Sequence, residues 1–149
     1  MTYLELAETT NRSGILVAID FEKAFDSLDH SFLFKVVEKF NLGPYFLQWI
    51  KTFYTDISSC VFNNGFTTDL FCVQRGVRQG DPLSPLLFIL ALEILTCLIR
   101  QDRNIKGITV NDEEIKLTVF AGDLTCVLQG KDSYHQLFKA VLYPKSEFL

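Results

Sequence analysis

Two short apolar stretches in this chain each lead into acidic residues. One covers residues 14–19 and is followed by Asp20, and the other covers residues 115–120 and precedes Asp123. Stretches of this length are too short for a helix and predict buried strands. A β-rich stretch at residues 124–128 predicts a returning strand after a tight turn. Carboxylates on such a frame can meet a metal ion, because Mg²⁺ prefers hard oxygen ligands and phosphoryl transfer needs several of them together.

A glycine-rich segment lies between these stretches and opens the most apolar part of the chain. Residues 75–85 read Arg-Gly-Val-Arg-Gln-Gly-Asp-Pro-Leu-Ser-Pro. Ser84 is a favoured helix cap and Pro85 a favoured first helical residue, so a long helix is predicted to about Arg100. The apolar run at residues 86–99 is shorter than the roughly 20 residues that a bilayer requires, which predicts a core helix and no membrane span.

Local signals predict the remaining elements. These are a helix capped by Asp29 or Ser31 and ended by residues 41–43, a helix with Pro44 in its first position, a hairpin about Asn63-Asn64-Gly65, paired strands at 105–110 and 114–120, and a helix at 134–142 capped by Asp132. Strands interleave with helices and hairpins. This order favours an α+β fold, with a mainly antiparallel sheet packed against helices, over a doubly wound parallel sheet.

In their order and spacing, these segments resemble motifs A, B and C of reverse transcriptases, most closely those of non-LTR (LINE-type) retrotransposons. The resemblance covers residues 14–141 and is carried by Asp-Phe-Glu-Lys-Ala-Phe-Asp at 20–26 and Arg-Gln-Gly-Asp-Pro-Leu-Ser-Pro at 78–85. A group II intron-type or other reverse transcriptase is the alternative family. The resemblance implies a palm-type antiparallel sheet, with residues 1–149 as a single partial domain from which the fingers and thumb are largely absent.

The resemblance also implies a metal and sugar site. Asp20 and Asp123 would be the catalytic carboxylates and would bind Mg²⁺, two ions in the family, with help from the backbone carbonyl of Phe21. Phe25 would lie under the sugar of the incoming nucleotide and select deoxynucleotides. The alternative interpretations are a strand end or helix cap for Asp20 and a core side chain for Phe25, since the chain has 14 Phe.

The glycine-rich segment matches the family motif that contacts the nucleotide and the template strand. This implies substrate-binding roles for Arg78, Gln79 and Gly80, because arginine can bind phosphate and glycine permits close backbone approach. The alternative is a glycine-rich turn into a helix. The partners implied are an RNA template, a DNA primer and deoxynucleotides, and fingers and thumb regions of a longer chain.

The chain departs from the family at the third motif. Where the family has aromatic-x-Asp-Asp, this chain has Phe120-Ala121-Gly122-Asp123, so Gly122 supplies no side-chain oxygen. Asp123 is the less critical aspartate of the family, and strand alternation predicts that it points away from the position where it could replace the missing partner of Asp20. We therefore expect only weak metal binding and a catalytically impaired copy. The alternative function is a non-catalytic relic that serves as a binding or interaction domain.

Composition limits the other possibilities. The net charge is −4 and the pI is about 5.1, whereas self-sufficient nucleic-acid binders usually show a basic face. The four cysteines form no Cys-x-x-Cys pair and are expected to be buried and reduced. The first residues carry no secretory signal pattern. These features predict an intracellular location, in the cytoplasm or nucleus, and no secretion.

Overall fold

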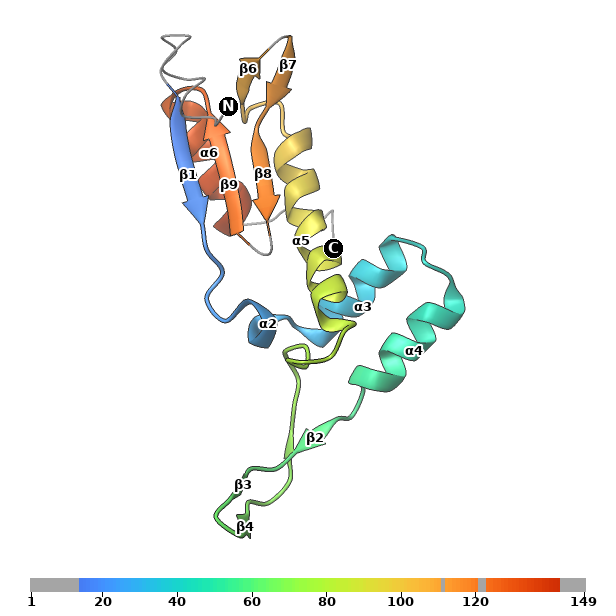
Figure 1. The fold of residues 1–149 in the computed structure, drawn as a ribbon. Helices are drawn as coiled ribbons and strands as arrows, with labels where there is room; N and C mark the ends of the chain where they lie inside the picture. Colours follow the sequence, from blue (N-terminus) through green and yellow to red (C-terminus); the bar gives the residue numbers. More distant parts are fainter. Residues whose placement is uncertain (1–13, 111, 121–122, 143–149) are drawn as a thin grey trace. The chain divides into compact units, whose positions relative to one another are not determined.

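The computed structural model describes residues 14–110, 112–120 and 123–142 (Figure 1). They form two compact units. The first combines the residues up to Phe21 with those from Leu92 onward, and the second holds residues 22–91. The longest helix, α5 (Ser84–Gln101), contributes to both units. Ala121 and Gly122 lie outside the described residues, so the prediction for Gly122 rests on the sequence alone.

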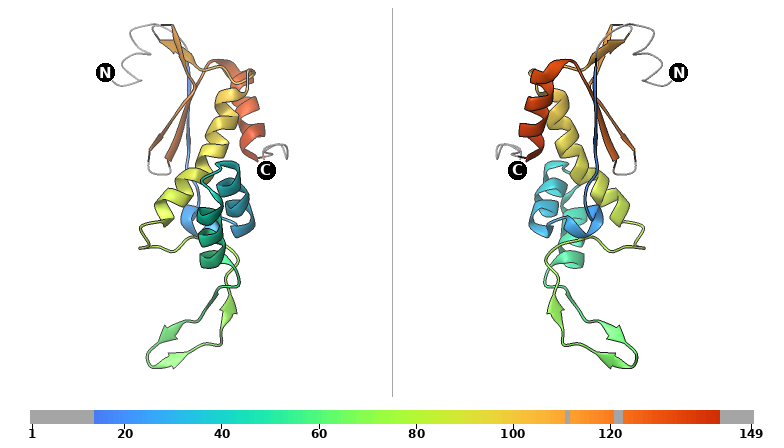
Figure 2. Two further views of the ribbon diagram at one scale, coloured as in Figure 1. Left: turned by 90° about the vertical axis from the view of Figure 1, so that its right-hand side faces the viewer. Right: turned by 90° about the vertical axis from the view of Figure 1, so that its left-hand side faces the viewer.

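The first unit contains a three-stranded antiparallel sheet. Its strand order is β1 (Ile15–Ile19), β9 (Asp123–Leu128) and β8 (Leu117–Phe120). Helix α6 (Gly130–Leu142) and the C-terminal part of α5 lie on one side of this sheet (Figures 1 and 2). The predicted mainly antiparallel sheet packed against helices is confirmed in this unit.

Strand alternation builds the core of the first unit. Alternate residues of β1 and β9 face the helices and are buried together with residues from α5 and α6, as expected for strands with one covered face. This core includes Ile15, Val17, Ile19, Leu124, Cys126, Leu128, Ile99 and Leu137. The intervening residues lie on the other face, where Leu16 and Ala18 of β1 are exposed and Val127 of β9 is buried. The sheet therefore has one packed face and a second face, called the open face, that is exposed along β1 and at the start of β9.

The strand predicted at residues 114–120 is wrong as a single element. It divides into β7 (Glu113–Ile115), which pairs with β6 (Ile108–Val110), and β8, which pairs with β9. The division falls at Lys116, whose buried Nζ donates to the backbone oxygens of Arg100 at 3.0 Å and Asp102 at 2.9 Å. A lysine at the C-terminal end of a helix satisfies carbonyls that have no partner within the helix, which explains why the chain departs from one ladder here.

The second unit begins with three helices and continues into a hairpin. The helices are α2 (Ala24–Ser27), α3 (His30–Lys39) and α4 (Pro44–Tyr54). The hairpin contains β2 (Ser58–Ser59), β3 (Phe62–Asn63), β4 (Phe66–Thr67) and β5 (Phe71–Cys72). Asn64 and Gly65 both have positive φ, 49° and 84°, which is the backbone that a tight hairpin turn requires. The predicted Asn-Gly hairpin and the Pro44 helix start are confirmed.

Helix α3 and helix α4 pack through one face each. Leu33, Val37 and Ile50 are buried in the core of the second unit, together with Leu87 from α5. On α4 three aromatic side chains spaced four residues apart are exposed. Tyr45, Trp49 and Phe53 are 75%, 61% and 52% exposed, so they form an aromatic stripe without a partner in the described residues.

The caps agree only in part with the sequence. The Asp29 carboxylate caps α3 as predicted, because its Oδ1 accepts from the Phe32 amide at 3.1 Å. The predicted Asp132 cap is wrong, since α6 already begins at Gly130 and places Asp132 in its first turn. The predicted burial of the cysteines is confirmed for Cys126 and wrong for two others, Cys60 and Cys72, which lie exposed in and beside the short hairpin strands.

By length and composition alone, helix α5 could cross a membrane, and 39% of its 18 residues are buried. Core helices meet the same two criteria. Leu87, Ala91 and Ile99 of α5 are buried against other elements of their own units. The feature is therefore weak evidence for a membrane span.

The Asp29 carboxyl makes the free energy of unfolding depend on pH. Hydrogen bonds from Ser31 Oγ and the Phe32 amide, with Arg75 nearby, lower the pKa of the Asp29 carboxyl below its ordinary value. A lowered folded-state pKa stabilises the fold above the unfolded-state pKa of about 3.9, and this stabilisation is lost as the pH falls through the folded-state pKa. We expect the free energy of unfolding to fall more steeply between about pH 5 and pH 2 in the parent than in Asp29→Asn.

Urea denaturation at a series of pH values measures this difference. Asparagine is an equally good helix cap, so the variant isolates the ionisable group from the capping bond. Parallel stability curves for the parent and Asp29→Asn would show that this carboxyl does not contribute to the acid response.

Candidate functional site

Asp20 and Asp123 lie at adjacent strand ends of the first unit. Asp20 directly follows β1, and Asp123 is the first residue of β9. The last pair of the β1–β9 ladder is Ile19 with Leu124, so the same register continued by one residue sets Asp20 opposite Asp123. Residues directly opposite one another in an antiparallel pair share a face. Both aspartates are exposed, and both belong to the open face of the sheet.

One sequence prediction concerns the direction of Asp123. Asp123 was expected to point away from the position where it could replace the missing partner of Asp20, but that position is Gly122, which lies outside the described residues, so the expectation stays a prediction. The structure places Asp123 itself on the open face. The reason is that β9 starts at Asp123 itself and buries Leu124 in the core, so alternation turns Asp123 to the open face that carries Asp20. The sequence reveals this only when the register of β9 against β1 is known.

The oxygen donors near Asp20 are too few for a two-ion magnesium site. The described residues contain no group of three or more His, Cys, Asp or Glu side chains that could hold a metal ion. Two carboxylates and the backbone carbonyl of Phe21, a residue whose side chain packs against the core, are the donors that the sequence indicates. Two-metal sites clamp both the attacking and the leaving oxygen, and each ion needs its own anionic ligands. The oxygen donors of the described residues therefore do not fit a pair of Mg²⁺ ions.

Phe25 belongs to the second unit and is packed on one side. Its ring stacks on Phe88 with 5.2 Å between the ring centroids, and it is partly buried against the core. These contacts favour the alternative interpretation as a core side chain. Selection of deoxynucleotides by Phe25 stays a prediction, and its replacement by alanine would also remove core packing.

The glycine-rich loop before α5 is held against the segment that contains α2. The Gly76 amide donates to the Leu28 carbonyl at 2.8 Å, and the Val77 amide donates to the Phe25 carbonyl at 2.8 Å. Gly76 has a φ of +92°, and a Cβ there would lie only 3.1 Å from Asp26 Cα, so both the conformation and the close approach require glycine. The two segments are therefore joined by backbone bonds.

The predicted substrate-binding residues are exposed on this loop. They are Arg78, Gln79 and Gly80. Gln79 Nε2 donates to Asp26 Oδ1 at 3.3 Å, and a cavity of about 430 Å³ beside the base of the hairpin is lined by Asp26, Gln79 and both arginines of the loop. The structure thus brings Gln79 into contact with Asp26, and the sequence did not indicate this contact.

His30 is the second residue that sequence reasoning missed. Its side chain is buried, with only 6% of the residue exposed. Its Nε2 lies 2.8 Å from the Gly76 carbonyl oxygen, to which it donates, and its ring lies 5.1 Å from the ring of Tyr54. No local pattern marks a contact between residues 46 positions apart.

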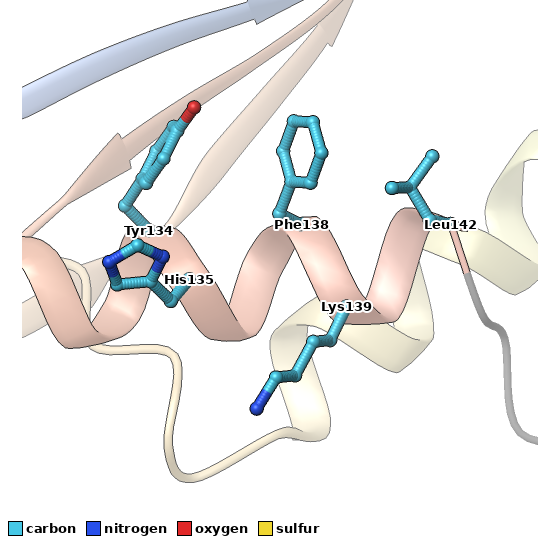
Figure 3. Close-up of a pocket in the computed structure, with 5 residues that line it drawn as sticks. All are labelled: Tyr134, His135, Phe138, Lys139 and Leu142. Carbon is cyan, nitrogen blue, oxygen red and sulfur yellow. The ribbon is translucent and has the colours of Figure 1, made fainter.

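A second hollow lies on α6 in the first unit. Figure 3 shows Tyr134, Phe138 and Leu142 along one side of the helix, with the His135 ring beside that of Tyr134 and Lys139 pointing away, and all five line the pocket. The lining contains no acidic side chain. It therefore offers no site for a metal ion.

Comparison with known proteins decides the family. A model of the family described as reverse transcriptase (RNA-dependent DNA polymerase) matches residues 2–144. The chain belongs to the reverse transcriptase family. This confirms the family that the three sequence motifs indicated, and the mixed helices and antiparallel sheet are consistent with a reverse transcriptase palm.

This reverse transcriptase chain is similar to proteins of mobile elements. It is 34% identical over 128 residues to the transposon TX1 uncharacterized 149 kDa protein of Xenopus laevis, covering 85% of the chain and 10% of that protein. It is 32% identical over 124 residues to a retrovirus-related Pol polyprotein from type-1 retrotransposable element R2 of Popillia japonica, covering 83% of the chain and 17% of that protein. It is 26% identical over 129 residues to the RNA-directed DNA polymerase from mobile element jockey of Drosophila funebris, covering 82% of the chain and 13% of that protein.

Proposed function

We propose that the chain is the palm portion of a reverse transcriptase from a non-LTR (LINE-type) retroelement, with RNA-directed DNA polymerisation by two-metal nucleotidyl transfer as its ancestral reaction. The observation that carries this proposal is the β1–β9 register, which sets Asp20 opposite Asp123 on the open face of an antiparallel sheet. The names of the R2 and jockey relatives support the retroelement origin.

The proposed partners in the complete protein are an RNA template, a DNA primer and deoxynucleotides. The chain spans between 10% and 17% of the length of the relatives described above. Its net charge is −4, whereas proteins that grip nucleic acid present lysine and arginine to the phosphates. We propose that fingers and thumb regions elsewhere in a longer chain make most of the contacts with the phosphates.

This copy is catalytically impaired in our proposal. Gly122 stands where the family carries an aspartate, so the sequence offers Asp20 and Asp123 but not the third carboxylate. The described residues supply no other acidic or histidine cluster to replace it. Fewer anionic ligands mean weaker binding of an ion that gives up its water reluctantly.

One observation supports the second candidate function, a non-catalytic interaction domain. The aromatic stripe of Tyr45, Trp49 and Phe53 is between 52% and 75% exposed, and exposed apolar patches mark surfaces that contact other molecules. The stripe would serve equally as a contact with the rest of a polymerase. Restoration of activity at position 122 distinguishes the two functions.

Magnesium binding tests the impaired site directly. We expect isothermal titration calorimetry of the chain with MgCl₂ to show no site tighter than about millimolar, because the clustered carboxylates that Mg²⁺ needs are incomplete. Asp20→Asn should weaken this binding further, and Gly122→Asp should strengthen it. A micromolar site that Asp20→Asn abolishes would contradict the proposal.

A further inference from the structure

The N-terminus of α3 docks onto the glycine-rich loop through both backbone and side chain. The His30 amide, the first of the helix, donates to the Gln74 carbonyl at 3.4 Å. The His30 Nε2 lies 2.8 Å from the Gly76 carbonyl oxygen. The first amides of a helix have no partner within it, so these bonds satisfy groups on both segments.

The bond to Gly76 requires a donor at one defined position. A carbonyl oxygen only accepts, so His30 must carry its proton on Nε2. The ring is buried and lies beside Tyr54, with the ring planes 58° apart. Burial makes the loss of this donor costly, because the Gly76 oxygen would lose a partner in a site where little water can replace it.

The loop has few other anchors between Gly76 and α5. The backbone bonds of Gly76 and Val77 and the Gln79 bond to Asp26 come directly after the carbonyl that His30 holds. Arg75 and Asp29 add an ion pair at 3.7 Å, with side chains 70% and 42% exposed, and exposed ion pairs of this kind contribute little. Val77 is also buried in the core of the second unit, so His30 supplies the buried side-chain hydrogen bond at the start of the loop and Val77 its apolar packing.

We propose that His30 is a positioning residue for the loop that carries Arg78, Gln79 and Gly80. Only the effect of His30 on catalysis rests on the proposed function, because that function makes the loop a contact for the nucleotide and the template. His30 touches neither substrate in this role. It holds the Gly76 carbonyl, and thereby fixes where the next four residues begin.

Two variants separate the donor from the ring. His30→Phe keeps a ring beside Tyr54 and removes the donor, whereas His30→Gln removes the ring and keeps an Nε2 donor of similar reach. In the 149-residue chain, we expect hydrogen exchange of the Gly76 and Val77 amides to speed up about tenfold in His30→Phe and to stay near the parent rate in His30→Gln. The Val127 amide, which bonds to the Lys116 carbonyl at 2.8 Å in the first unit, is the control and should not change.

Several outcomes would overturn the positioning role. Parent-like exchange in both variants would show that the bond does not hold the loop. Equal acceleration in both would show that ring packing, and not the donor, is responsible. If His30→Phe does not fold, nitrogen-15 spectra of the parent, which identify the tautomer of His30, decide the question. The Nε2–H tautomer is expected, and the Nδ1–H tautomer would contradict the proposal.

The consequence for catalysis is measured separately. In a chimeric polymerase that carries Gly122→Asp, adding His30→Phe should raise the KM for deoxynucleotides about tenfold while kcat changes little, since a displaced loop weakens binding. His30→Gln should restore the KM. If Gly122→Asp yields no extension at all, the loss of one carboxylate does not explain inactivity, but the exchange and tautomer measurements still decide the role of His30.

Discussion

Gly122→Asp should raise primer extension on an RNA template by about a hundred- to a thousandfold over the Gly122 parent. This is the usual effect of a single electrostatic stabiliser at a reacting centre, about 3 to 4 kcal/mol, and a metal ligand should contribute at least as much. The frame for the new carboxylate is present, because β8 ends at Phe120 and β9 begins at Asp123 beside Asp20. Aspartate also tolerates tight turns.

The measurement needs surfaces that hold primer and template. The chain is therefore placed in a chimera with the fingers and thumb of a related reverse transcriptase, and extension is followed with Mg²⁺. Asn64→Asp is the matched control, since it adds the same charge at an exposed residue of the hairpin turn, where aspartate tolerates the positive φ of 49°. A further Asp20→Asn change should abolish the restored activity.

Two results would contradict this account. Equal extension by the Gly122 parent would show that the site is not impaired. Failure of Gly122→Asp in a folded chimera would leave the family assignment intact, but would show that the loss of one carboxylate does not explain inactivity.

Gly107→Ala should destabilise the first unit by about 3 kcal/mol, the upper part of the usual range for forced overpacking. A Cβ at Gly107 would collide with the Ile115 carbonyl oxygen and lie 2.6 Å from its carbon and 2.9 Å from Lys116 Cα. These are backbone atoms, and Lys116 is held in place because its Nζ binds the end of α5. The collision therefore cannot be relieved by turning a side chain.

Urea denaturation measures this loss, and Gly14→Ala is the matched control. The one close contact of a Cβ at Gly14 would be the Cδ1 atom of Ile108, at 2.8 Å, which is the flexible end of a side chain, and its distance to the Leu128 carbonyl oxygen would be an ordinary 3.6 Å. We expect Gly14→Ala to cost less than about 1 kcal/mol, because a rotamer change relieves the contact. Equal stability of the parent and Gly107→Ala would show that the β6–β7 hairpin does not pack as described.

Elements specified by neighbouring residues could be predicted from the sequence. The strand before Asp20, the Asp29 cap, the helix start at Pro44 and the turn at Asn64-Gly65 each depend on residues a few positions apart. The family could be predicted for a similar reason, because long local strings carry the motifs. Local chemistry decides these features before tertiary structure forms.

Features that depend on distant partners could not be predicted in this way. The break at Lys116 requires the end of α5, the face of Asp123 requires the register against β1, and the burial of His30 requires Gly76. The sequence also did not show at which residue β9 begins, and this decides the face on which Asp123 lies. The family motifs also gave no sign of Asp26 or His30 as partners of the loop.

The register of β9 is kept by packing of the core and does not depend on the reaction. A slip of one residue would expose Leu124, Cys126 and Leu128 to water and bury their polar neighbours, so folding alone keeps Asp123 aimed at the open face. In our proposal Gly122 replaces an aspartate, and neither residue type adds an apolar side chain to the core of the first unit. A copy of the gene under no demand for DNA synthesis can therefore lose its chemistry by one base change, while every generation still inherits the geometry of an intact palm.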